Sequence, residues 1–319
     1  MSFSAKEQAT GNLFGKLFSA YDDEGFKRSV ELFERRFREN GFDLDWFKGK
    51  RCLDAGCGGG RYSIALAHLG AKTVDGVDLG EVSIADGRRR AAALQAAQVT
   101  FHVGSVAALP FPDASFDCVV CSGVLQHTAD PVRVLDELAR VTRPGGMLYM
   151  LVYATEGLRW PLVQMLRPIA ASIGFEALDA AVAKAGLPVN RRRTYLDDLF
   201  VPYIDFYSWE SLAGQLTQRG FGDIVRWEKG RLDHEESMAA YATDLQGFLD
   251  VFAAAASDRA GLTPIQLASV KHGTQLCEAA CAFAHDLAGR VDAGTLSADE
   301  ARRLAIGQGH HRLVAWKAA

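Results

Sequence analysis

Short apolar runs alternate with longer helical patterns between Lys50 and Tyr153. Such an alternation is typical of a parallel sheet whose strands are joined by helices. Strands are predicted at 51–54, 72–78, 100–104, 116–121 and 147–153, and further strands at 223–228 and 311–316. The sequence therefore predicts an α/β fold, with a doubly wound, mostly parallel sheet of about seven strands covered by helices.

The chain is longer than such a sheet needs. It has 319 residues, of which 49% are hydrophobic, enough for a large core. We predict an N-terminal helical segment at 1–49 that acts as a lid, and a core at 50–230 with a substrate-covering insert at about 156–207. A helical insertion is predicted at 231–308 and a final core strand at 309–319. The surplus length is thus interpreted as insertion rather than as a second domain.

Charge and composition exclude several classes of protein. The 35 basic and 39 acidic residues give a net charge of −4 and form no long basic stripe, which argues against a nucleic-acid partner. The most apolar stretch, Gly145 to Ala154, is about half of the ~20 residues that a membrane helix needs, so no membrane partner is expected. Six cysteines show no disulfide or metal-site spacing, which predicts no metal and a cytoplasmic location.

A glycine-rich loop carries the strongest chemical signal. The segment Leu53-Asp54-Ala55-Gly56-Cys57-Gly58-Gly59-Gly60 lies between a predicted strand and a predicted helix, where glycines let the backbone turn tightly and approach a ligand. Asp78 ends the next strand, about 20 residues later, where a carboxylate can accept hydrogen bonds from ribose hydroxyls. Together they indicate a cofactor of the adenosine type.

The spacing of the glycines separates the candidate cofactors. A dinucleotide fingerprint would place its third glycine at position 61, which is Arg61 here. The loop also lacks the lysine that a P-loop needs for a nucleoside triphosphate. A nicotinamide-dependent oxidoreductase on a similar sheet therefore stays only as an alternative.

Taken together, the motifs resemble those of class I S-adenosylmethionine-dependent methyltransferases, which have a Rossmann-like fold. The resemblance covers about Lys50 to Tyr153 closely. It is carried by the glycine loop and by three further segments, Gly76-Val77-Asp78-Leu79, Leu109-Pro110-Phe111-Pro112-Asp113-Ala114-Ser115-Phe116-Asp117 and Arg140-Val141-Thr142-Arg143-Pro144-Gly145-Gly146.

The resemblance implies S-adenosylmethionine as the cofactor and assigns residues to it. Those expected at the cofactor are Asp54, Gly56, Cys57, Gly58, Asp78, Leu79, Ser105, Val106 and Ser122. The glycines are expected to line its methionine part, Asp78 to hold the ribose, and Leu79 to contact the adenine. Ser105 stands where the family usually has an acidic residue that meets the adenine amino group. Adenine recognition is therefore expected to depend more on the Val106 amide and on packing.

Candidates for catalysis and substrate binding lie outside those motifs. His127 follows the fourth predicted strand, beside the expected methyl donor, and is interpreted either as a general base or as a packing residue under the cofactor. Tyr21, in the N-terminal segment, is a lid candidate. Arg192 belongs to a triple arginine that either clamps an anionic substrate or faces solvent. Tyr203 and Tyr207 either line the substrate pocket or pack the insert.

The predicted function is methyl transfer to a small-molecule acceptor through an O, N, S or C nucleophile, as in biosynthesis. The sequence has neither the [DN]PP[YFW] motif of base-amino methyltransferases nor the Pro-Cys dipeptide of cytosine-C5 enzymes. Two alternatives remain open. One is the NAD(P)-dependent oxidoreductase, and the other is a non-catalytic scaffold that binds S-adenosylmethionine or forms a homodimer through its C-terminal helices.

Overall fold

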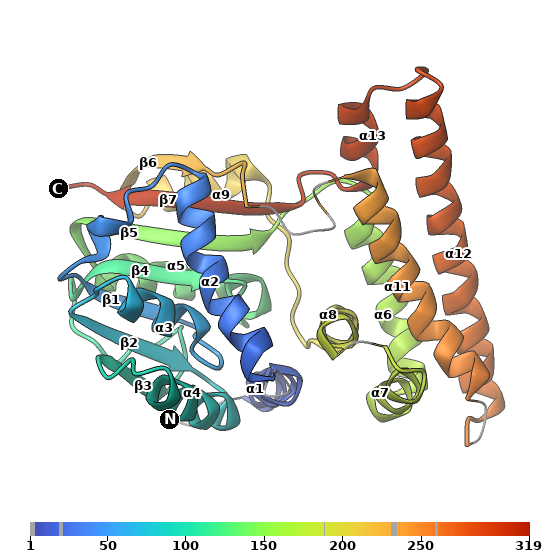
Figure 1. Ribbon diagram of the computed structural model, residues 1–319, viewed down its shortest axis with the longest axis horizontal. Coiled ribbons are helices and arrows are strands. Elements are labelled where there is room, and N and C mark those ends of the chain that lie inside the picture. The colour runs from blue at the N-terminus through green and yellow to red at the C-terminus, as the bar shows by residue number, and fades with distance from the viewer. Residues whose placement is uncertain (1–3, 19–21, 188, 231–234, 236, 259–260) are drawn as a thin grey trace. The chain divides into compact units, whose positions relative to one another are not determined.

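The computed structural model describes residues 4–18, 22–187, 189–230, 235, 237–258 and 261–319 (Figure 1). For Phe18 and residues 189–192 it describes the backbone alone. The chain divides into two compact units. The sheet unit comprises Met1–Tyr153, Pro202–Gly230 and His310–Ala319, and the helical unit comprises Ala154–Val201 and Arg231–Gly309.

The sheet has the predicted architecture. Its strands are β1 (Arg51–Ala55), β2 (Thr73–Asp78), β3 (Val99–Val103), β4 (Phe116–Ser122), β5 (Thr142–Tyr153), β6 (Phe221–Arg226) and β7 (His310–Lys317), in the order β3-β2-β1-β4-β5-β7-β6. Neighbouring strands from β3 to β5 run parallel, whereas β7 runs antiparallel to both β5 and β6. The prediction of seven mostly parallel strands is confirmed.

Helices cover both faces of this sheet. The helical elements of the sheet unit are α1 (Ala5–Phe18), α2 (Asp23–Glu39), η1 (Leu44–Phe47), α3 (Arg61–His68), α4 (Glu81–Ala93), η2 (Leu125–His127), α5 (Pro131–Val141) and α9 (Trp209–Thr217). One buried cluster joins α2, α3 and α4 to one face, and a second joins α5 and α9 to the other. Alternation along β4 explains this, because Cys118 belongs to the first cluster and Cys121 to the second.

The helical unit is built from α6 (Arg159–Ile173), α7 (Phe175–Lys184), α8 (Val189–Phe200), α11 (Met238–Ser257), α12 (Pro264–Asp292) and α13 (Ala298–Ala305). A capping box at Thr263 and Gln266, followed by a proline in the first turn, begins the long helix α12. No helix in the described ranges is both long and apolar enough to cross a membrane.

The structure changes the predicted division of the chain. The predicted insert at 156–207 and the predicted insertion at 231–308 do not form separate additions, since 154–201 and 231–309 pack together as the helical unit. The segment 202–207 belongs instead to the sheet unit, because the Asp205 amide donates to the Gln126 carbonyl (2.9 Å) and the Tyr207 amide to the Tyr153 carbonyl (3.0 Å). The predicted N-terminal segment contributes α1, α2 and η1 to the sheet unit.

Candidate functional site

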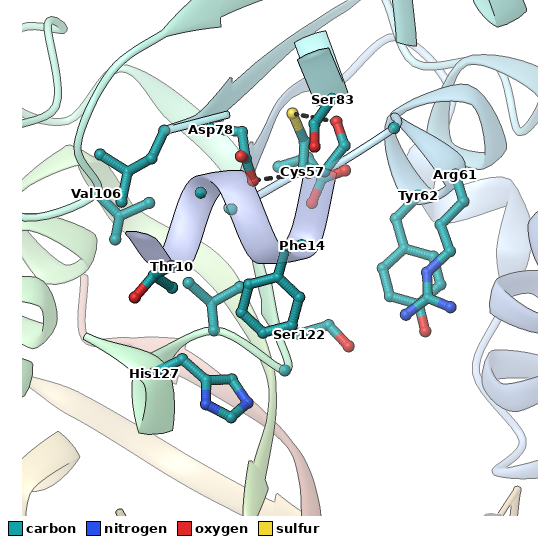
Figure 2. Close-up of a pocket in the computed structure, with 18 of the residues that line it drawn as sticks. Thr10, Phe14, Cys57, Arg61, Tyr62, Asp78, Ser83, Val106, Ser122 and His127 are labelled. Carbon is teal, nitrogen blue, oxygen red and sulfur yellow. Dashed lines mark hydrogen bonds between the residues drawn. The ribbon is translucent and has the colours of Figure 1, made fainter. Parts of the chain in front are cut away.

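A pocket of the sheet unit lies at the carboxyl ends of β1, β2 and β4 (Figure 2). This is the edge at which open parallel sheets bind ligands. Of the predicted cofactor residues, all but Ser105 line it, namely Asp54, Gly56, Cys57, Gly58, Asp78, Leu79, Val106 and Ser122. In Figure 2, Asp78 and Val106 lie at one end, Phe14 and His127 at a second, and Arg61 and Tyr62 at a third.

The glycine loop has a backbone that other residues would strain. Gly56, Gly58 and Gly60 have φ values of +78°, +52° and +82°, in the left-handed region that favours glycine. A β-carbon on Gly56 would stand 2.3 Å from a Val124 methyl, whereas one on Gly58 would meet nothing within 4 Å. Gly56 is therefore required by close packing, and Gly58 leaves space where a ligand can approach the backbone.

Asp78 ties this loop to the end of β2. Its Oδ2 accepts from the Gly58 amide (2.9 Å) and its Oδ1 from the Gly80 amide (2.8 Å). Burial raises the pKa of Asp78, and the two amide donors partly offset this. A carboxylate has about four lone-pair positions, so both oxygens can still accept from a ligand in the pocket.

Asp54 is the second carboxyl group that lines the pocket, and it is fully buried. It is 2% exposed, and its Oδ2 accepts from the Ser63 hydroxyl (2.7 Å). Burial raises the pKa of Asp54 from 3.8 to about 6, against the opposing effect of the Ser63 hydrogen bond and of the Arg61 charge. The group thus titrates near neutral pH in the folded protein.

This pKa shift predicts a pH dependence of stability. Because the folded state holds the Asp54 proton more tightly than the unfolded chain, its contribution is complete below about pH 4 and is lost as pH rises through about 6. The expected loss is about 3 kcal/mol, at 1.4 kcal/mol per pH unit. Urea unfolding at pH 5 and pH 7.5 should show Asp54→Asn gaining stability relative to wild type at the higher pH. An equal difference at both pH values would contradict this assignment.

His127 is held in one orientation by the main chain. It lies at the end of η2, is 6% exposed and lines the pocket. Its Nδ1 is 2.9 Å from the Tyr203 carbonyl oxygen. Because a carbonyl oxygen only accepts, Nδ1 carries the proton in this bond, and the neutral ring then has its lone pair on Nε2. The ring also packs against Phe14 (centroids 5.3 Å apart) and Tyr153 (5.2 Å).

The remaining candidates lie elsewhere. Ser105 does not line the pocket, and its hydroxyl accepts from the Ala107 amide (3.2 Å) within its own turn. Tyr203 reaches the site only through its carbonyl, and Tyr207 is buried in the core cluster of α5 and α9. Neither tyrosine lines the pocket. Tyr21 lies outside the described residues, and Arg192 lies on α8 of the helical unit, with its side chain outside them.

Sequence reasoning missed several pocket residues. The structure adds Thr10, Gly11 and Phe14 from α1, and Arg61 and Tyr62 from the first turn of α3. The α3 pair directly follows the glycine loop, a position that could have indicated them. Nothing in the local sequence of α1 points to the pocket. The helix is placed by packing against residues far away in the sequence. Gly11 lies so close to Leu79 and Gly80 that a β-carbon at position 11 would stand 3.3 Å from their main chain.

Comparisons with known proteins agree with this geometry. A family model described as a methyltransferase domain matches residues 53–150. The chain contains a class I S-adenosylmethionine-dependent methyltransferase domain. Over 149 residues it is 30% identical to a demethylmenaquinone methyltransferase of Shouchella clausii, covering 46% of this chain and 63% of that one. Over 139 residues it is 32% identical to a ubiquinone biosynthesis O-methyltransferase of Neisseria meningitidis, covering 41% and 58%.

These matches to the methyltransferase domain span less than two thirds of either relative. Among solved structures, the YcgJ protein of Bacillus subtilis aligns with a TM-score of 0.51 and 17% identity, over 88% of this chain and 99% of that one. At that identity the likeness shows the fold alone.

The pocket of the methyltransferase domain fits S-adenosylmethionine, the cofactor of this family. A half-buried carboxylate with lone pairs to spare, Asp78, faces the same space as the bare backbone of Gly58. The Asp78 carboxylate suits a pair of ribose hydroxyls, and the Gly58 backbone suits the part of the ligand that must pass close to the glycine loop. Leu79 and Val106 supply apolar surface at the Asp78 end of the pocket.

Proposed function

We propose that the protein transfers a methyl group from S-adenosylmethionine to a small-molecule acceptor and releases S-adenosylhomocysteine. One observation carries the proposal: a single pocket brings together the glycine loop, the Asp78 carboxylate and the imidazole of His127. The first two suit the cofactor, and the third suits an acceptor that must lose a proton.

Different pocket residues would contact different parts of the cofactor. Asp78 would accept from the ribose hydroxyls, and Leu79 and Val106 would contact the adenine. Gly56 and Gly58 would lie along the methionine part, with Asp54 and Ser122 near its ammonium group.

Arg61 and Tyr62 would donate to the methionine carboxylate. The Tyr62 hydroxyl is oriented by Arg36, whose Nη1 lies 2.6 Å away. Burial raises the pKa of Tyr62, but the charges of Arg36 and Arg61 outweigh this and hold it below its usual value.

The rate of the reaction depends mainly on how the protein positions the acceptor relative to the methyl group. The cofactor supplies an electrophilic methyl group on a positively charged sulfur. The protein has to hold the acceptor atom in line with that bond and to exclude water. For an acceptor with an ionisable proton, His127 Nε2 would take the proton as the new bond to carbon forms and the bond from carbon to sulfur breaks. The Tyr203 carbonyl would stabilise the resulting imidazolium, because it accepts from Nδ1.

The acceptor is proposed to be a small metabolite. The relatives are named for menaquinone and ubiquinone biosynthesis, which supports a biosynthetic intermediate, and the net charge of −4 disfavours nucleic acid. A cytoplasmic location and a homodimer formed through the C-terminal helices stay predictions.

Calorimetry and a turnover assay test the proposal. Binding of S-adenosylmethionine and S-adenosylhomocysteine but not NAD would support it, and preferential binding of NAD would favour the oxidoreductase. Release of S-adenosylhomocysteine should then be measured over a panel of phenols, thiols, amines and carbon acids. Cofactor binding without turnover on any of them would favour the non-catalytic scaffold.

His127→Ala should separate the two interpretations of this residue. For an acceptor that keeps its proton at the assay pH, we expect kcat to fall about 100-fold, because a positioned base contributes on that order. Affinity for S-adenosylhomocysteine should change little, since the expected contacts of His127 are with the acceptor. An unchanged kcat would leave His127 a packing residue only.

A further inference from the structure

Gln126, next to His127, has a side chain whose hydrogen-bonding groups lack partners. The residue is 0% exposed, and neither Oε1 nor Nε2 has a hydrogen-bond partner among the described residues. Burying an amide group without a partner is costly, so native proteins rarely keep both of its atoms unsatisfied. Among the described residues, this amide therefore makes no hydrogen bond that would offset the cost of its burial.

The main chain around Gln126 is held by hydrogen bonds. The Gln126 carbonyl accepts from the Asp205 amide (2.9 Å), and the His127 amide donates to the Val124 carbonyl (2.8 Å). The segment that supplies Asp205 also supplies the Tyr203 carbonyl that orients His127. The segment 203–205 therefore holds both the backbone of Gln126 and the ring of His127, but none of its described groups bonds the Gln126 amide.

The amide lies directly behind the pocket wall. Its Nε2 stands 3.9 Å from the place that a β-carbon would take on Gly123, and Gly123 lines the pocket. Gly123 and His127 both line the pocket, whereas Gln126 lies behind them and does not line it. To contact a ligand at this end of the pocket, the Gln126 amide would have to turn past Gly123, which has no side chain in the way.

We propose that Gln126 is a specificity residue for the methyl acceptor, and that it selects a neutral group that both donates and accepts, such as a carboxamide or a carbonyl beside a hydroxyl. This inference rests on the proposed function. The carboxamide offers one acceptor and a donor pair. A ligand with both functions satisfies both atoms, whereas a carboxylate would satisfy the nitrogen and leave two oxygens facing each other. The Phe14 ring at the same end suits an aromatic carrier of that group.

The substitution Gln126→Met tests this proposal, because it should stabilise the protein and at the same time weaken ligand binding. Methionine keeps the length of the side chain and removes its polar groups, so we expect the melting temperature to rise by about 2 °C. Binding should weaken at the same time. Binding is measured by calorimetry on protein saturated with S-adenosylhomocysteine. Wild type should bind salicylamide at least tenfold more tightly than salicylate. The variant should bind salicylamide about tenfold more weakly than wild type does, with its affinity for salicylate unchanged.

Tyr241→Phe in the helical unit serves as the matched control, because its hydroxyl is another buried group without a partner among the described residues. It should leave salicylamide binding unchanged. A lower melting temperature for Gln126→Met, unchanged salicylamide binding by that variant, or wild type that binds neither probe or both equally overturns the proposal. Failure of S-adenosylhomocysteine itself to bind would instead contradict the proposed function, and the melting temperature would still report on Gln126.

Discussion

Asp78→Ala should lower the affinity for S-adenosylhomocysteine by at least about 100-fold. Two hydrogen bonds from ribose hydroxyls to a carboxylate, at about 1.5 kcal/mol each, account for a factor of that size. The substitution also removes the acceptors of the Gly58 and Gly80 amides, which hold the glycine loop against the end of β2. Both effects act on the same ligand, so the loss should exceed that from any other single pocket residue.

Isothermal titration calorimetry measures this affinity, and the chain offers two controls. Asp75→Ala removes a carboxylate from the same strand that bonds His102 (2.8 Å) and does not line the pocket, so its affinity should stay near that of wild type. His127→Ala changes the acceptor end of the pocket and should bind almost normally. Near-equal affinities for Asp78→Ala and His127→Ala would refute the role given to Asp78.

The sheet and the part of the pocket lined by the glycine loop and Asp78 could be predicted because their signals are local. Alternating apolar and helical segments mark the strands, and glycines at fixed distances from Asp78 mark the loop. Ser105 was assigned to the cofactor from its position in the family pattern. Its hydroxyl instead accepts from the nearby main-chain amide of Ala107.

The end of the pocket around His127 depends on contacts between distant parts of the chain, which no local pattern encodes. The Tyr203 carbonyl orients His127 across 76 residues of sequence, and α1 brings Phe14 to the same ring. Tyr203 was predicted for its aromatic side chain, but the structure uses its backbone oxygen. The packing of 154–201 with 231–309 was missed for the same reason, since it joins two segments that the sheet unit separates in sequence.

Arg159→Ala should lower the free energy of unfolding of the helical unit by about 3–5 kcal/mol. Arg159, on α6, is 2% exposed, and its guanidinium contacts Asp198 on α8 (2.9 Å) and Asp244 on α11 (3.2 Å). Its loss leaves two buried carboxylates without this cation, and also removes the stacking of the guanidinium on Trp160 (4.5 Å). Three helices that this single side chain joins would therefore separate more easily.

Hydrogen exchange resolves this loss by unit, because a chain with two compact units need not unfold in one step. Amides of α6, α8 and α11 should exchange about a hundredfold or more faster in Arg159→Ala, at about 1.4 kcal/mol for each factor of ten, while those of β1 and β4 should keep their protection.

Lys184→Ala is the matched control, since its ion pair with Asp258 (2.7 Å) is mostly exposed on the lysine side and is worth about 0–1 kcal/mol. The triple variant Arg159→Met, Asp198→Asn, Asp244→Asn should recover part of the loss, because it removes the two carboxylate charges together with the cation that they bond. A loss no larger than that of Lys184→Ala would show that the buried network does not hold the unit together.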